Sequence, residues 1–155
     1  MDSLSSTLQS SRLSDVSPHP NSIPITLTRS YNVRSVVTDV WVQLFSDRIV
    51  FGISQLNTKV GSFVLCHVDE SIIDNRIRFM VMPLLGKTDD VVSEVFARQV
   101  TEKIAALRTT SDATATSCPS VLLGISLKST DPETFHVLAD LLVNLYKEAI
   151  QLASS

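Results

Sequence analysis

The stretch that decides the fold is VLLGISLKSTDPE at residues 121–133. Its first seven residues form a short and nearly continuous apolar run, which is typical of a buried central strand. Thr130 and Glu133 then have the spacing of a capping box, and Pro132 is tolerated in the first turn of a helix. Because large apolar residues recur at helical spacing over residues 135–152, the stretch predicts a buried strand followed directly by an amphipathic helix.

Five further runs with strand character precede this stretch. They cover residues 23–28, 36–45, 48–54, 60–68 and 77–82. The first two alternate along their length, as expected when the two faces of a strand differ in burial. Ser46 and Asp47 form a short polar turn between the second and third runs, so these two runs predict an antiparallel hairpin. Pro83 is expected to end the fifth run, because proline cannot donate a hydrogen bond to a central ladder.

Another helix is predicted between the fifth run and the last strand. Thr88, Asp89 and Asp90 can cap free amides at its start and place negative charge at the positive end of its dipole. Residues expected to face the core then recur at helical spacing: Val92, Val95, Phe96, Val100, Ile104 and Leu107. The order βββββαβα predicts an α+β fold in which an antiparallel-rich sheet of about six strands packs with two α-helices.

The chain divides into a tail and one domain. Residues 1–22 hold eight serines and few large apolar groups, so ordering them would not recover the roughly 1–2 kcal/mol of backbone entropy lost per residue. We therefore predict a disordered Ser-rich tail at 1–22 and a single domain at 23–155. A transit peptide is disfavoured because Asp2 and Asp15 stand against a single basic residue, Arg12.

Composition and charge exclude several classes of partner. The net charge is -3 and the pI is about 5.5, which gives no electrostatic reason to expect nucleic acid or an anionic membrane surface. No apolar run approaches the roughly 18 residues of a membrane span. Cys66 and Cys118 make neither a zinc site nor a disulfide framework. The predicted location is the cytoplasm, with the nucleus also open.

The sequence favours binding over catalysis. Cys66 and His67 are adjacent, but neighbouring strand residues point to opposite faces, so the thiol and the imidazole should diverge. Gly86-Lys87-Thr88 resembles the end of a phosphate-binding loop, but Val81 stands where that motif needs its first glycine. We predict no catalytic residue, no metal site and no cofactor.

Aromatic residues on the predicted strands suggest where a partner could bind. Trp41, Phe45, Phe51 and Phe63 are most simply expected to be core residues. If both faces of the sheet are as apolar as the strand patterns indicate, two helices would not cover them completely. A remaining apolar patch would then be a partner surface.

Four short motifs carry a family resemblance. They are Val81-Met82-Pro83-Leu84-Leu85-Gly86-Lys87-Thr88-Asp89-Asp90, Phe96-Ala97-Arg98, Val121-Leu122-Leu123-Gly124-Ile125-Ser126-Leu127 and Ser129-Thr130-Asp131. Together they resemble the small eukaryotic proteasome assembly chaperones 3 and 4, over about residues 33–152. The strand, the Ser-Thr-Asp run and the helix after it look more like chaperone 4, whereas residues 59–64 are similar to a stretch of chaperone 3. Of the two, chaperone 4 is favoured.

The resemblance implies a non-catalytic protein. Such a chaperone pairs with a sister chaperone as a heterodimer, binds an alpha-type subunit of the 20S proteasome, helps to order the alpha ring and leaves before the particle matures. The resemblance implies neither a nucleic-acid nor a membrane partner. The turn formed by Leu84, Leu85, Gly86 and Lys87 is expected to lie near a partner contact.

Two other classes of function stay open at the level of the sequence. A small dimeric α+β adaptor of the longin or roadblock kind, acting in trafficking or signalling, would also be acidic and non-catalytic. The Leu84-Leu85-Gly86 turn after five strands argues mildly against it. A small hydrolase or thiol enzyme is the third class, and it would need a reactive Cys66.

Overall fold

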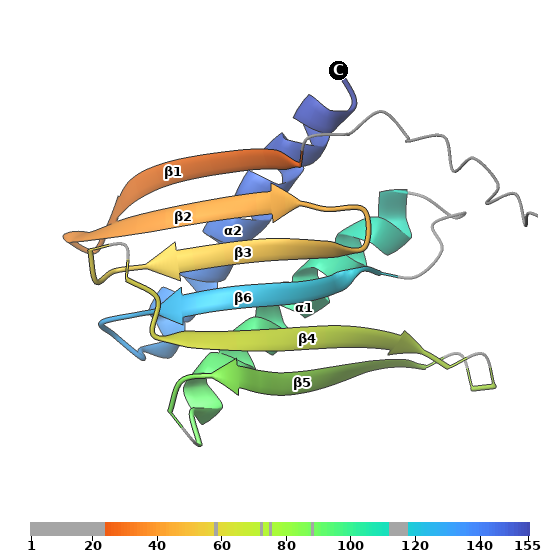
Figure 1. Ribbon diagram of the computed structural model, residues 1–155, viewed down its shortest axis with the longest axis horizontal. Helices are drawn as coiled ribbons and strands as arrows, with labels where there is room; N and C mark the ends of the chain where they lie inside the picture. The colour runs from red at the N-terminus through yellow and green to blue at the C-terminus, as the bar shows by residue number, and fades with distance from the viewer. Residues whose placement is uncertain (1–23, 58, 72, 75, 88, 112–117) are drawn as a thin grey trace, which may run out of the picture.

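The computed structural model describes residues 24–57, 59–71, 73–74, 76–87, 89–111 and 118–155. The predicted tail at 1–22 and Thr88 of the predicted helix cap lie outside the described residues. The elements are β1 (Ile25–Val33), β2 (Val36–Leu44), β3 (Arg48–Ser54), β4 (Ser62–Glu70), β5 (Ile77–Leu85), α1 (Val91–Ser111), β6 (Ser120–Ser126) and α2 (Pro132–Ala153). Their order is βββββαβα, which confirms the predicted α+β fold (Figure 1).

The six strands form one mixed sheet in the order β1-β2-β3-β6-β4-β5. β3 and β6 run parallel, and every other neighbouring pair is antiparallel. The hairpin predicted around Ser46 and Asp47 is confirmed as the β2–β3 pair. β6 lies between β3 and β4, so it has a strand on each side. This central position explains why the sequence of β6 is a nearly continuous apolar run.

Both helices pack on the same face of the sheet, and the core lies between them and the strands (Figure 1). The helices and strands contribute side chains with no exposed surface: Phe96, Val100 and Ile104 from α1, Leu138, Leu142 and Leu145 from α2, and Val40, Val42, Phe51, Ile53, Val121 and Leu123 from the sheet. The rings of Phe96 and Phe135, whose centroids are 5.3 Å apart, join the two helices. The core is therefore a single layer between one sheet face and two helices.

The core-facing side of α1 differs from the prediction at two valines. Phe96, Val100 and Ile104 are fully buried as expected, but Val95 is 55% exposed and Val92 is 38% exposed. The buried stripe instead includes small residues one turn apart: Ser93, Ala97, Thr101 and Ala105. Small side chains let a helix lie close to the sheet. Because the small residues of α1 face the sheet, Val95 points toward solvent. Hydrophobic periodicity could not reveal this, because it weights large residues most heavily.

The first strand is longer than predicted and runs from Ile25 to Val33 rather than over residues 23–28. Its second half was missed because its side chains are mostly polar and exposed, as befits an edge strand. A two-residue turn, Arg34 and Ser35, connects it to β2, and both residues have positive φ, 49° and 64°. Two-residue hairpins use such turns, although glycine or asparagine is the usual occupant.

Pro83 does not end the fifth strand. β5 continues to Leu85, because it is an edge strand and a missing N–H on its outer side leaves no ladder bond unmade. The register shifts here, since Val64 pairs with Pro83 while Phe63 pairs with Leu85. Leu84 is therefore the extra residue of a β-bulge.

Acidic residues begin both helices, but only the first acts as predicted. The N–H of Ser93 donates to Oδ1 of Asp90 at 3.2 Å, so Asp90 caps α1. The capping box predicted for α2 is absent: Asp131 is the N-cap, and Glu133 binds Nη2 of Arg34 at 2.9 Å. Arg34 also donates to Asp131 at 2.7 Å. Glu133 thus joins the β1–β2 turn to the start of α2 instead of closing a local box.

Candidate functional site

Among the described residues, no helix covers one face of the sheet, since α1 and α2 both lie behind the strands in Figure 1. Side chains alternate along each strand, so the residues between the core positions point to this open face. The strand pairing aligns them in rows across the sheet. One row contains a residue from every strand: Thr28, Trp41, Gly52, Gly124, Phe63 and Leu85.

Two glycines at the centre of this row make room for two aromatic rings. Gly52 and Gly124 are cross-strand partners on β3 and β6. A Cβ atom at Gly52 would lie 1.8 Å from Cε2 of Trp41, so the indole covers the place where a side chain would begin. A Cβ atom at Gly124 would lie 3.2 Å from Cε1 of Phe63. The two rings therefore lean over the glycines from opposite sides and fill the middle of the face.

The neighbouring row is also apolar. Val50, Leu122, Leu65 and Met82 are successive partners across β3, β6, β4 and β5, and Met80 follows along β5. Met82 is 41% exposed, Met80 is 53% exposed and Leu85 is 64% exposed. We call the combined surface the apolar sheet face: Trp41, Val50, Phe63, Leu65, Met80, Met82, Leu85 and Leu122. Continuous exposed apolar surface of this kind marks an interaction site, whereas single exposed apolar residues are ordinary.

Polar residues border the apolar sheet face. β1 contributes Thr26, Thr28, Ser30 and Asn32 to the same side of the sheet. At another border, Nδ1 of His67 and Oγ of Ser120 are 2.7 Å apart and share a hydrogen bond. An apolar centre with a polar border is the usual anatomy of a protein–protein interface.

The turn predicted to lie near a partner divides between two surfaces. Leu85 belongs to the apolar sheet face, and Leu84, the bulge residue, is 57% exposed beside it. Gly86 has a φ of 127°, and a Cβ atom there would lie 2.5 Å from Oγ of Ser62, so this position requires glycine. Lys87 lies beyond the turn and lines a cavity at the starts of the helices. All four residues are exposed, as a contact surface needs.

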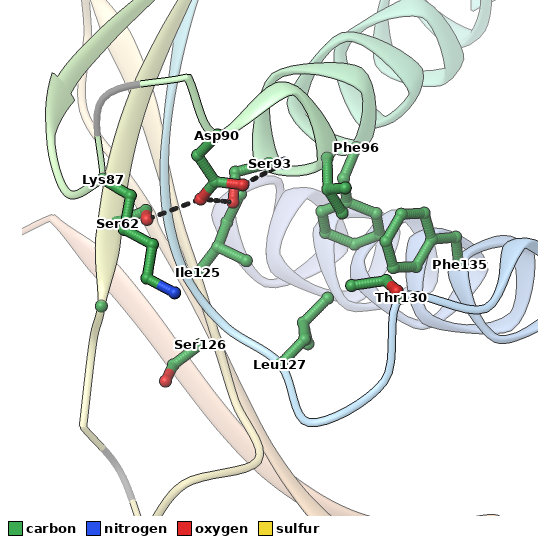
Figure 2. A pocket seen from close by; sticks show the side chains of 12 residues that line it. Ser62, Lys87, Asp90, Ser93, Phe96, Ile125, Ser126, Leu127, Thr130 and Phe135 are labelled. Carbon is green, nitrogen blue, oxygen red and sulfur yellow. Dashed lines mark hydrogen bonds between the residues drawn. The ribbon is translucent and has the colours of Figure 1, made fainter.

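The cavity beside Lys87 has a volume of about 280 Å³ and lies among Ser62, Ser93, Phe96 and Phe135 (Figure 2). Partial burial opposes ionisation of Asp90, but hydrogen bonds from Ser93 and Ser62 outweigh it, so the pKa of Asp90 is lowered. Oγ of Ser62 donates to Oδ2 of Asp90 at 2.9 Å. The carboxylate is therefore occupied in holding the turn to α1, and its arrangement is structural.

The adjacent Cys66 and His67 diverge as predicted. Cys66 is fully buried on the core side of β4, whereas His67 is exposed on the open face. Burial raises the pKa of the Cys66 thiol, and it likewise raises the pKa of the Cys118 thiol, so both favour the unreactive thiol form at neutral pH. Among the described residues, no cluster of three or more His, Cys, Asp or Glu side chains could hold a metal ion. No helix in the described part of the chain has the length and apolar character needed to cross a membrane.

The structure corrects the expectation that the strand aromatics are core residues. Phe51 is fully buried, but Trp41 and Phe63 are partly exposed on the open face and Phe45 is 41% exposed. Their places in the sequence contained a signal, since Trp41 and Phe45 alternate with the core residues of β2. The pairing of Gly52 with Gly124, which completes the face, depends on a parallel contact between distant segments and had no local signal.

Comparison with known proteins relates this architecture to proteasome assembly. A family model described as proteasome assembly chaperone 3 matches residues 51–145. A solved chain from the "Crystal Structure of a Novel Chaperone Complex for Yeast 20S Proteasome Assembly" is similar in fold, with 16% sequence identity and a TM-score of 0.58, over 80% of this chain and 98% of that chain. No curated protein sequence matches. Because the family model spans more than half of its residues, the chain belongs to the proteasome assembly chaperone 3 family.

Proposed function

We propose that the chain is a non-catalytic chaperone that promotes assembly of the 20S proteasome alpha ring, by binding an alpha-type subunit together with a sister chaperone. The observation that carries this proposal is the apolar sheet face, which the chain's own helices leave uncovered. Family membership supports a role as a proteasome assembly chaperone. The sister chaperone and the alpha-type subunit are the partners that we assign to its surfaces.

The size of the open face suits the sister chaperone. Six strands spaced about 4.8 Å apart, with roughly 25 Å of each strand paired, give a face of about 700 Å². A stable protein–protein interface buries about 800 Å² on each partner. A sister of the same fold would present a similar face, and two sheets pack face to face about 10 Å apart. Pairing would thus cover Trp41, Leu65 and Leu122 from water.

The turn at Leu84 and Lys87 is the contact that we assign to the alpha-type subunit. It lies at the end of the edge strand β5, next to the apolar sheet face but not beneath its centre. Because the turn is short, this interface would be smaller than the sheet interface. It would also be more polar, since Leu84 and Lys87 would contribute one apolar and one charged contact. A smaller polar interface favours release before the particle matures.

Three further points belong to the proposal. Buried Cys66 and Cys118 thiols with raised pKa values support a non-catalytic role. We assign the working location to the cytoplasm and nucleus, to be checked by imaging a fluorescent fusion. The preference for chaperone 4 over chaperone 3 stays a prediction, because the match to the chaperone 3 family model does not distinguish between these two members.

The test is a tagged pull-down from a eukaryotic lysate with bound proteins identified by mass spectrometry. The wild-type chain should recover free alpha-type proteasome subunits and a second small chaperone, with little mature proteasome. Met82→Asp places a charge on the apolar sheet face and should lose the sister chaperone. Lys87→Glu should keep the sister chaperone and lose the alpha-type subunit.

Leu152→Asp is the matched control, because Leu152 is an exposed apolar residue like Met82 but lies near the end of α2, away from the open face of the sheet. It should retain both partners. Thermal unfolding of all three variants should resemble wild type, since each altered side chain is exposed. Recovery of an unrelated trafficking or signalling complex would instead support a role as an adaptor. If Met82→Asp recovered as much of the sister chaperone as the wild-type chain does, the apolar sheet face would be rejected as the binding site of the sister.

A further inference from the structure

A second cavity, of about 430 Å³, lies at the opposite end of the strands from the Leu84–Lys87 turn. The β2–β3 hairpin supplies Leu44, Phe45 and Asp47, α2 supplies Tyr146 and Ile150, and the last turn of α1 supplies Arg108. Its volume falls within the range of roughly 300–1,000 Å³ that small-ligand sites occupy. Its wall combines apolar side chains with polar groups, including one partly buried cation.

Arg108 differs from most other described arginines in having no carboxylate partner among the residues that the structure describes. The arginines that form ion pairs are Arg29, Arg34, Arg48, Arg78 and Arg98. Arg108 makes one hydrogen bond in the described part of the chain, from Nη1 to Oη of Tyr146 at a long 3.3 Å. Its Nε is buried and has no hydrogen-bond partner. Buried donors are almost always satisfied, so this orphan N–H indicates a missing acceptor.

The vacant donors form one edge of the guanidinium group. With Nη1 directed to Tyr146, Nε and Nη2 lie side by side and have no hydrogen-bond partner in the described part of the chain. Two parallel N–H groups of this kind match the two oxygens of a carboxylate. We propose that this cavity binds a monocarboxylate with a small apolar body, the carboxylate accepting hydrogen bonds from Nε and Nη2 of Arg108.

The remaining walls restrict the ligand further. Leu44, Ile49 and Ile150 would contact the aliphatic or aromatic body of the ligand, which leaves the carboxylate for the polar part of the wall. Asp47 borders the cavity and is paired with Arg48 at 2.8 Å, so its negative charge would disfavour a doubly charged phosphate more than a single carboxylate. Because Nε has no exposed surface, the Arg108 side chain must turn toward the cavity when the ligand enters.

Such a carboxylate could belong to a free carboxylic acid or to the C-terminal residue of a polypeptide. Two probes separate these sources: 4-methylpentanoate represents the free acid and N-acetyl-leucine represents a chain terminus. N-acetyl-leucinamide has the same apolar body without the charge. The measurement is the NMR signal of the Arg108 Nε–H group in the full ¹⁵N-labelled chain during titration with each probe at constant ionic strength.

The Arg108 signal should shift in a saturable way with at least one acid and not with the amide. Arg108→Lys keeps the charge but loses the paired donors, and should weaken binding about tenfold or more. Arg98→Lys on the same helix is the matched control and should bind as wild type does. Ile150→Trp, at a partly exposed wall position, should block the cavity without removing Arg108.

Tighter binding of N-acetyl-leucine would assign the site to a chain terminus, and tighter binding of 4-methylpentanoate would assign it to a free acid. Equal binding of the amide and the acids would overturn the proposal, because the charge would then be irrelevant. Unchanged affinity in both Arg108→Lys and Ile150→Trp would also overturn it. These results are independent of the pull-down, since none of the cavity residues belongs to the apolar sheet face.

Discussion

Gly52 shows how one residue shapes the proposed interface, because the Trp41 ring occupies the space where any larger side chain would begin. The glycine contributes nothing to a partner contact itself. It allows the indole to lie across the sheet, where the ring offers its broad surface to a partner. Glycine in the interior of a strand is otherwise unfavourable, which is consistent with a packing role at this position.

Gly52→Ala should therefore destabilise the fold by about 1–3 kcal/mol, the usual range for overpacking, and should displace Trp41. Urea unfolding gives the free energy, and Trp41, the single tryptophan of the chain, reports the displacement by its fluorescence. Gly61→Ala is the control, because the nearest atom to its Cβ would be 3.5 Å away, an ordinary contact. Equal stability of the two variants would contradict the overpacking argument.

Asp90 provides a second prediction at this scale. Its pKa is lowered in the folded protein because hydrogen bonds from Ser93 and Ser62 outweigh the effect of partial burial. Because the pKa is lower in the folded state, ionised Asp90 stabilises the fold at pH values above its unfolded-state pKa. This stabilisation is lost as the pH falls through the folded-state pKa. Asp90→Asn should cost about 1 kcal/mol at pH 7, since an amide nitrogen in place of Oδ2 cannot accept the hydrogen bonds from the Ser62 and Ser93 hydroxyls.

The cost of Asp90→Asn should shrink as the pH falls below about 4, because the wild-type carboxyl then also becomes neutral. Chemical denaturation at a series of pH values measures this convergence. Asp89→Asn is the comparison at pH 7: Asp89 is exposed, and this variant should unfold at about the same denaturant concentration as wild type. A cost for Asp90→Asn that stays constant down to pH 2 would refute the role given to the carboxylate.

At the level of elements, the β1–β2 hairpin combines an unfavourable turn with a long-range contact. Arg34 and Ser35 both adopt positive φ, where side chains other than Gly, Asn or Asp are uncommon. The guanidinium of Arg34 reaches Asp131 and Glu133 at the start of α2. Both ion pairs are solvent-exposed, so they orient the turn more than they stabilise it.

Ser35→Gly should stabilise the protein by about 0.5–1 kcal/mol, because glycine adopts positive φ without the clash of a Cβ atom. Thr28→Gly, within β1, should lose about the same amount, since glycine weakens a strand interior. Thermal unfolding measures both effects: the midpoint should rise for Ser35→Gly and fall for Thr28→Gly. A loss of stability in Ser35→Gly would show that the turn is not strained by its side chain.

At the scale of the whole molecule, the main feature is the asymmetry of the sheet: in the part of the chain that the structure describes, both helices lie on one face and no helix lies on the other (Figure 1). The covered face forms the core of the described domain, and the open face leaves apolar side chains exposed, which is typical of an interaction site. The order of strands produces this arrangement. The parallel connection from β3 to β6 carries α1 across one face of the sheet, and α2, which follows β6, packs on the same face.

Trp41 makes this asymmetry measurable. Addition of the sister chaperone should lower acrylamide quenching of Trp41 fluorescence about twofold or more and shift its emission to shorter wavelength, because the indole leaves water. The Trp41→Phe variant supplies the background from the sister. Met82→Asp, which weakens the interface without touching the indole, should restore quenching. Undiminished quenching in the wild-type complex would place the sister elsewhere.

The sequence by itself determined the number and order of elements, because periodicity and turn residues act over short distances. The apolar run at 121–127, the break at Ser46 and Asp47 and the acidic start of α1 identify strands, a hairpin and a helix with little error. It also indicated that the sheet could be apolar on two faces. The predicted turn at Leu84–Lys87 is exposed, but Leu84 and Leu85 still belong to β5 and only Gly86 and Lys87 lie beyond the strand.

Only the tertiary structure decided which face remains open and what lies on it. Neither the pairing of Gly52 with Gly124 nor the meeting of Arg108 with Tyr146 has a local signal, because each joins residues far apart along the chain. Pro83 within β5 and the exposure of Val95 likewise depend on position at a sheet edge and on the close approach of a helix. Local sequence fixes elements through short-range forces, whereas their packing selects which side chains water can reach.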